Sequence, residues 1–167
     1  MIKKSGKLIL TMFNIGKLGK FPGTIASAIT SSLYIFFFYF KVHYLTLFLI
    51  FLLLLLVSIY LINLLKDEFE EVDSKEIVID EYLGQSIPIL FFYVILFEAS
   101  VSINFFMIIV LISFIGFRFF DILKPFPVNF FDRNYKNSFG VIMDDVCAGF
   151  YVVLSLICFM LLTNYLI

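Results

Sequence analysis

The amino-acid sequence predicts an all-α fold, a polytopic bundle of membrane-spanning helices that forms one domain over residues 1–167. Hydrophobic residues make up 62% of the chain, and the mean hydropathy is +1.07. A chain of 167 residues is one domain by length, but this apolar content exceeds what a water-soluble core requires. Several uncharged runs are also long enough to cross a bilayer. We therefore expect an integral, multi-pass membrane protein.

Five segments are expected to cross the membrane. At about 1.5 Å per residue, the uncharged run 44–65 is long enough to cross a hydrocarbon core of about 30 Å. The predicted spans are, in order, residues 25–40, 44–65, 82–97, 99–117 and 146–167. The third is expected to be short or broken, because Gly84, Gln85 and Pro88 lie near its start. Lysines and a proline interrupt any signal-like stretch before the first span, so we expect that span to remain in the mature protein.

The charged residues are distributed unequally between the two sides of this topology. With five crossings, the N-terminal tail and the loops 66–81 and 118–145 share one side, which carries eleven of the twelve Lys and Arg residues. The positive-inside rule makes that side cytoplasmic. Twelve of the thirteen acidic residues lie there as well. We therefore predict a polar site that faces the cytoplasm.

The first candidate motif is GKLGKFPGT, residues 16–24. Its glycines allow close backbone approach, Lys20 brings positive charge, and Pro22 stiffens the turn. Thr24 can cap the following helix and leave free amides that suit an anion. Lys20, Gly23 and Thr24 are therefore candidate substrate contacts. The alternative is an ordinary capped loop beside lysines of the membrane surface.

The second motif is DSKEIVIDEYLGQ, residues 73–85. If the segment is helical, Glu76 and Asp80 share one face at i and i+4, and Glu81 lies beside them at the membrane boundary. Carboxylates at this spacing can hold a hard divalent cation, and their apolar neighbours make unpaired acids costly. The preceding acidic stretch, residues 66–73, is expected to be a solvated surface.

The third motif, FRFFDILKPFPVNFFDR at residues 117–133, supplies basic groups. Arg118, Lys124 and Arg133 are candidates for gripping a phosphate. Substitution of Arg133 is expected to be more harmful than substitution of Lys124, since a guanidinium can bind two phosphate oxygens at once. The alternative is that Arg118 pairs with Asp121, and Arg133 with Asp132, as ion pairs at the membrane edge.

A pair of adjacent acids, Asp144 and Asp145, follows directly in GVIMDD. Brought next to Glu76, Asp80 and Glu81, they would repel one another unless a cation lay between them. Magnesium would resolve that repulsion. The predicted metal ligands are therefore Glu76, Asp80, Asp144 and Asp145.

These stretches, in this order, resemble the phosphatidylglycerophosphatase A family of bacterial membrane lipid phosphatases, and the resemblance covers residues 16–149. It implies a Mg²⁺-dependent hydrolase of the inner membrane, acting in phospholipid biosynthesis, that converts phosphatidylglycerophosphate to phosphatidylglycerol. The family's acidic positions fall on Glu76, Asp80, Glu81, Asp121, Asp144 and Asp145, and its small and basic positions on Gly23, Thr24, Lys124 and Arg133. The segment 134–139 is more Asn-rich than the usual link, which affects the detail of substrate contacts more than the reaction.

The expected mechanism is attack by a water activated by the metal. The only histidine, His43, lies in a predicted outer turn, and the aspartyl-phosphate signature D-x-D-x-[TV] is absent, so no covalent nucleophile is evident. The predicted catalytic residues are Asp80, Glu81, Asp121 and Asp145, one of which would accept the proton.

The expected partners are the phospholipid substrate and the membrane, with no nucleic acid, and the sequence leaves the oligomeric state open. Alternatives are a phosphatase for another phosphorylated lipid, a transporter, or a non-catalytic anchor subunit. A transporter should carry ionisable groups within its spans, which the long predicted spans lack.

Overall fold

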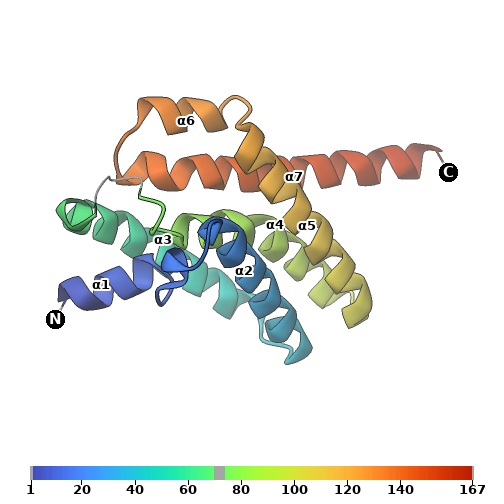
Figure 1. Cartoon of the computed structure of the whole chain (residues 1–167). Helices are drawn as coiled ribbons and strands as arrows, with labels where there is room; N and C mark the ends of the chain where they lie inside the picture. Colours follow the sequence, from blue (N-terminus) through green and yellow to red (C-terminus); the bar gives the residue numbers. More distant parts are fainter. Residues whose placement is uncertain (1, 70–73, 167) are drawn as a thin grey trace.

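The computed structural model of the chain describes residues 2–69 and 74–166. Over these ranges the chain is helical without strands, which confirms the predicted all-α class. The helices are α1 Ile2–Leu10, α2 Pro22–Tyr39, α3 Tyr44–Leu65, α4 Ile79–Glu98, α5 Ile103–Leu123, α6 Val128–Asn134 and α7 Ser138–Leu166, with short 3₁₀ turns at Ile15–Lys17 and Lys66–Glu68. Figure 1 shows α2, α4 and α5 running in a similar direction beside one another.

Four of the described helices are long and apolar enough to cross a membrane: α3 with its following turn, α4, α5 and α7. The first predicted span corresponds to α2, which is less apolar because it carries several hydroxyl residues. Ser27, Thr30 and Ser31 are buried, and each donates a hydrogen bond of 2.9 Å to the carbonyl four residues earlier. These hydroxyls are therefore satisfied within the helix and need no water.

The predicted break in the third span is wrong, because α4 runs without interruption through Pro88. Proline has no N–H to offer the carbonyl of Gly84, four residues earlier. That carbonyl lies against α7, where a Cβ added to Gly149 would come within 2.4 Å of the Gly84 oxygen. The close approach of the α7 backbone covers the freed carbonyl, so the helix continues inside protein.

The crossing of α4 with α7 also places the polar ends of both helices together. A Cβ added to Gly84 would lie 2.6 Å from the carbonyl oxygen of Asp145, so only glycine allows this contact. Gly84 lies one turn after Asp80, and Gly149 one turn after Asp145. The two glycines therefore hold two candidate metal ligands at a fixed separation.

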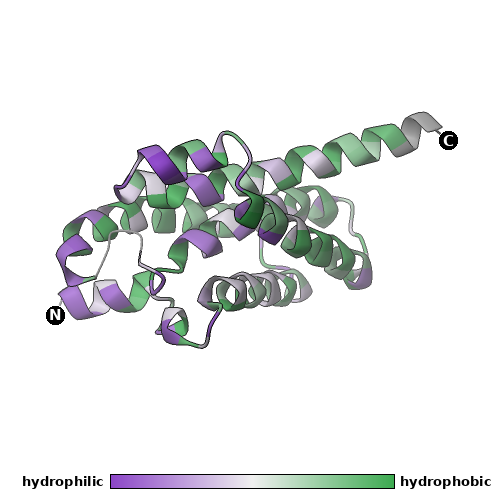
Figure 2. Ribbon diagram, turned by 45° about the horizontal axis from the view of Figure 1, so that its top comes forward, coloured by the Kyte–Doolittle hydropathy of each residue, from purple (hydrophilic) through white to green (hydrophobic). Residues whose placement is uncertain are grey.

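Polar residues gather at one end of the bundle. In Figure 2 they colour α1, α6, the beginning of α7 and the adjoining loops, whereas the bodies of α3 and α5 are hydrophobic. Within this end, α6 packs on α7, and α1 packs on α3 through Gly6, which faces Leu61 and Leu65. The arrangement brings the three sequence motifs to a common end of the membrane helices.

Candidate functional site

Five acidic side chains converge at the polar end of the bundle, from three helices distant in the sequence. This acidic cluster comprises Asp80 and Glu81 in the first turn of α4, Asp121 in the last turn of α5, and Asp144 and Asp145 near the start of α7. Asp121 lies close enough to interact with both Glu81 and Asp145. Of the acids expected to meet, the structure brings Asp80, Glu81, Asp144 and Asp145 together, and their roles stay a prediction.

The centre of the cluster fits a hard divalent cation. Carboxylate oxygens of Asp80, Glu81 and Asp145 all lie within 4.8 Å of one another. Asp80 is 8% exposed and Asp145 4%, and among the described residues Glu81 Oε2 has no hydrogen-bond partner. Buried carboxylates at this separation repel one another strongly. An all-oxygen donor set of this kind suits Mg²⁺ or Ca²⁺.

The first turn of α2 closes one side of the cluster. Gly23 is buried, and a Cβ added there would come within 1.9 Å of Glu81 Oε1. Thr24 follows it and is half-buried, whereas Lys20 is exposed. The contact observed for Gly23 is thus with a carboxylate of the site. Substrate contacts by Lys20, Gly23 and Thr24 stay a prediction.

Glu76 lies apart from this centre because the segment is not helical at Glu76, so the condition for Glu76 and Asp80 to share a helical face is not met. α4 begins only at Ile79, since the amide of Val78 donates to the carbonyl of Leu10 at 3.0 Å and holds the preceding segment against α1. The Glu76 side chain is 47% exposed, and its Oε2 lies 3.7 Å from Lys17 Nζ. Its role as a metal ligand stays a prediction without support from this geometry.

The acidic stretch before this segment is described only in part. Asp67 and Glu68 are exposed, as expected of a solvated surface, and Glu68 pairs with Lys3 and Lys7 of α1. Residues 70–73 lie outside the described residues.

Arg118 brings positive charge to the cluster. Its Nη1 lies 2.7 Å from Asp121 Oδ2, and its side chain is only 19% exposed, so the ion pair foreseen as an alternative is present. The N–H groups at Nε and Nη1 nevertheless make no aligned hydrogen bond to any described residue. Arg118 therefore balances the charge of Asp121 at the edge of the cluster.

Lys124 is held by two carboxylates. Its Nζ donates to Asp132 Oδ1 at 2.6 Å and to Asp144 Oδ2 at 3.0 Å, and so joins the ends of α5, α6 and α7. Burial lowers the pKa of Lys124, but the hydrogen bonds to Asp132 and Asp144 outweigh burial and raise the pKa above its usual value. Lys124 therefore stays charged and balances Asp144, while its contact with phosphate stays a prediction.

The alternative pairing of Arg133 with Asp132 is not present, because Asp132 pairs with Lys124 instead. Arg133 is exposed on α6, and within residues 2–69 and 74–166 it makes no ion pair. Its expected grip on phosphate is therefore not favoured by this geometry, although it stays untested.

Comparison with known proteins identifies the family. The family model described as phosphatidylglycerophosphatase A matches residues 8–160, which include the whole acidic cluster. The chain belongs to the phosphatidylglycerophosphatase A family.

Three relatives of this phosphatidylglycerophosphatase A family member illustrate how far the similarity extends. A Haemophilus influenzae phosphatidylglycerophosphatase A is 55% identical over 42 residues, 25% of this chain and 26% of that protein. The Escherichia coli K12 phosphatidylglycerophosphatase A is 28% identical over 93 residues, 56% of this chain and 48% of that protein. A Bacteroides thetaiotaomicron protein, provisionally named a phosphatidylinositol-3-phosphatase, is 32% identical over 148 residues, 86% of each chain. No solved structure matches.

Three residues of this family member's site escaped sequence reasoning. Gly84 and Gly149 set the approach of α4 to α7, and Asp132 shares Lys124 with Asp144. The spacing of each glycine one turn after an acid is visible in the sequence, but its meaning depends on knowing that the two helices cross there.

Proposed function

We propose that this chain is a Mg²⁺-dependent phosphatase that converts phosphatidylglycerophosphate to phosphatidylglycerol at the cytoplasmic face of the bacterial inner membrane. The observation that carries the proposal is the buried group of carboxylate oxygens from Asp80, Glu81 and Asp145, at the polar end of a membrane bundle and beside Arg118. A phosphomonoester at this place would meet both a cation site and the positive charge of Arg118.

Asp80, Glu81 and Asp145 would hold the metal, with Gly23 leaving room for the Glu81 carboxylate. Bound Mg²⁺ supplies charge to the phosphoryl oxygens and a more acidic water. Lys124 holds Asp144 in place, and the Arg118 guanidinium, paired with Asp121, would bring positive charge to the phosphate.

Asp121 borders the three-carboxylate group without belonging to it. We therefore assign Asp121 the role of general base, which accepts a proton from the attacking water. The new bond joins water oxygen to phosphorus, the ester bond to the lipid oxygen breaks, and the lipid leaves as an alcohol after taking up a proton. The remaining product is inorganic phosphate.

A second substrate is a phosphoinositide, because the relative that aligns over 86% of this chain is provisionally named a phosphatidylinositol-3-phosphatase. Both lipids present a phosphomonoester at the membrane surface, and the acidic cluster suits either one.

The deciding experiment measures phosphate release by purified protein in vesicles. The substrates are phosphatidylglycerophosphate, phosphatidylinositol 3-phosphate, phosphatidic acid and a soluble phosphate ester, each with Mg²⁺ or with EDTA. We expect the highest kcat/KM for phosphatidylglycerophosphate and no release in EDTA. A higher kcat/KM for phosphatidylinositol 3-phosphate would make the phosphoinositide the proposed substrate. If no lipid released phosphate, the proposed phosphatase activity would be rejected.

The proposed orientation predicts the labelling of single cysteines introduced after Cys147 and Cys158 are replaced. Cysteines at Ser74 and Asn137 should react with an impermeant thiol reagent only after the cells are permeabilised. The control is a cysteine at Ser100, in the exposed turn between α4 and α5, which should react in intact cells. Reaction at residue 74 or 137 in intact cells would overturn the orientation.

The proposed phosphate contact predicts that Arg118→Lys is more harmful than Arg133→Lys. Lysine keeps the charge of Arg118 but loses the planar donors, a loss of about 1.5 to 3 kcal/mol, or about ten- to two-hundredfold in rate. The exposed Arg133 serves as the matched control and should tolerate the change. The measurement is kcat/KM at saturating Mg²⁺ in protein shown to be inserted, and equal losses in both variants would contradict the assignment.

A further inference from the structure

The turn between α5 and α6 places a lysine where the backbone favours glycine. Lys124 follows the last residue of α5 and has a positive φ of 45°. Residues other than glycine are uncommon in this left-handed region, and where one persists the surrounding structure holds it there. The ammonium supplies that constraint, because Nζ donates to Asp132 Oδ1 at 2.6 Å and to Asp144 Oδ2 at 3.0 Å. Lys124 is therefore fixed both by the turn and by two carboxylates.

The two carboxylates that share Lys124 differ in what else they face. Asp144 belongs to the acidic cluster, its Oδ1 accepts a hydrogen bond from the amide of Asp145 at 3.0 Å, and its charge acts on both Asp80 and Asp145. Asp132 lies on α6, which packs on α7, and its side chain is 25% exposed against 12% for Asp144. Asp132 is thus joined to the acidic cluster through Lys124.

The space between α6 and α7 at this bridge is too small for a substrate phosphate. The crevice lined by Asp132, Asp144 and Gly140 has a volume of about 10 Å³. That is no more than one water molecule needs. The carboxylate of Asp132 therefore has Lys124, and not a bound substrate, as its partner on this side of the cluster.

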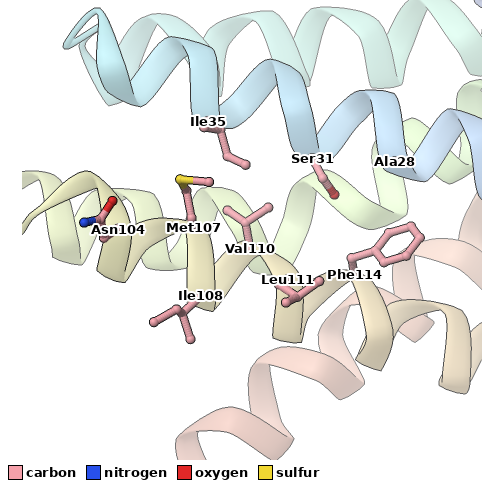
Figure 3. A pocket seen from close by; sticks show the side chains of 9 residues that line it. All are labelled: Ala28, Ser31, Ile35, Asn104, Met107, Ile108, Val110, Leu111 and Phe114. Carbon is pink, nitrogen blue, oxygen red and sulfur yellow. The ribbon is translucent and has the colours of Figure 1, made fainter.

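The charges that act on the three-carboxylate group come from the polar end of the bundle. Further along the membrane helices, the groove between α2 and α5 is walled by uncharged side chains, among them Ile35, Met107 and Leu111 (Figure 3). Apolar surroundings screen a charge far less than water does. One ammonium beside Asp144 therefore has a strong effect on how tightly a divalent cation is bound.

We infer that Asp132 is a positioning residue that sets the affinity of the three-carboxylate group for its cation by holding Lys124. This inference rests on the proposed function, since it assumes that the group binds Mg²⁺. Without Asp132, the ammonium of Lys124 would turn fully to Asp144, beside Asp145, and would repel the incoming cation. With Asp132 in place, the ammonium is shared between two carboxylates, and Asp144 keeps part of its negative charge beside the metal ligands.

The test measures Mg²⁺ binding without any lipid substrate. The Kd for Mg²⁺ is obtained from the rise in melting temperature of the purified protein, in neutral detergent, over a series of Mg²⁺ concentrations. Asp132→Asn should raise this Kd about tenfold, which is the lower end of what outer partners of metal ligands contribute. Lys124→Gln should lower the Kd by a similar factor, because it removes a positive charge from beside Asp144. A bridge with a structural role alone would weaken Mg²⁺ binding in both variants.

The double variant shows whether Asp132 acts through Lys124. Once Lys124→Gln is present, Asp132→Asn should change the Kd little further, whereas additive effects would make Asp132 an independent charge and overturn its positioning role. Glu68→Gln is the matched control, since it breaks an ion pair of the same 2.6 Å length, with Lys3, and should leave the Kd unchanged. The melting temperature in EDTA reports whether each variant is folded, and Lys124→Met repeats the test of sign if Lys124→Gln is not.

Weaker Mg²⁺ binding in both single variants, or an unchanged Kd in both, would overturn the inference while the phosphatase function stands. Failure of the wild type to bind Mg²⁺ would instead reject the metal site of the proposed function itself.

Discussion

Asp80→Asn and Asp145→Asn should each lower kcat/KM for lipid dephosphorylation by at least about a hundredfold, since even the outer partners of metal ligands are worth roughly ten- to a hundredfold. Each change removes a charged oxygen from the three-carboxylate group with little change in shape. The same variants should melt at a higher temperature than the wild type when Mg²⁺ is absent, because one of three mutually repelling buried charges is gone.

Mg²⁺ binding to the folded protein should raise the melting temperature of the wild type and leave that of Asp80→Asn nearly unchanged. Asp67→Asn is the matched control, because Asp67 is exposed in the turn after α3 and should affect neither rate nor melting. Mg²⁺-dependent activity that survives in Asp80→Asn would place the metal elsewhere. Full activity in both cluster variants would show that the three-carboxylate group is not the catalytic site.

Gly23→Ala should lower kcat/KM by about a hundredfold, because a misplacement of about 1 Å at a reacting centre has an effect of this size. The added methyl would lie 1.9 Å from Glu81 Oε1, so the carboxylate must move away from Asp80 and Asp145. Alanine favours a helix more than glycine does, so weaker helix formation cannot explain the loss. The concentration of Mg²⁺ needed for half-maximal activity should rise in the same variant.

Gly116→Ala is the control for this substitution, since its methyl would lie 3.3 Å from a methyl group of Val152, which can shift slightly. Its activity should be close to that of the wild type. A double variant with Glu81→Asp adds an independent check, because the shorter side chain makes room for the methyl. The two changes should then be clearly non-additive, and strict additivity would show that Gly23 does not act through Glu81.

The positions of the membrane helices and the gathering of the acids could be predicted because they depend on local patterns. The uncharged run 44–65 coincides with α3, since hydropathy alone decides its extent. The acids of α4, α5 and α7 meet because nearly all charged residues lie in loops at one end of the bundle. The turns at the other end carry few charges. Neither result requires knowledge of how particular side chains pack.

The failures arose where a distant segment overrides a local preference. Pro88 leaves α4 intact because Gly149 of α7 covers the carbonyl that proline cannot bond. Residues near Glu76 stay non-helical because Val78 is bonded to α1. Asp132 pairs with Lys124 across a chain reversal, where Lys124 adopts a positive φ of 45°. The sequence neighbour Arg133 is not the partner of Asp132, because the turn determines which charged side chains meet.

The glycine contact between α4 and α7 has a consequence for how the site responds to the surrounding bilayer. Membranes of different thickness change the tilt of helices, and here any such tilting would pivot on Gly84 and Gly149, one turn from the acids. At about 5.4 Å from a pivot, a rotation of about 3° displaces a residue by only about 0.3 Å. Because the helices pivot next to the acidic cluster, their outer ends can tilt to fit the bilayer. The distance between Asp80 and Asp145 then hardly changes.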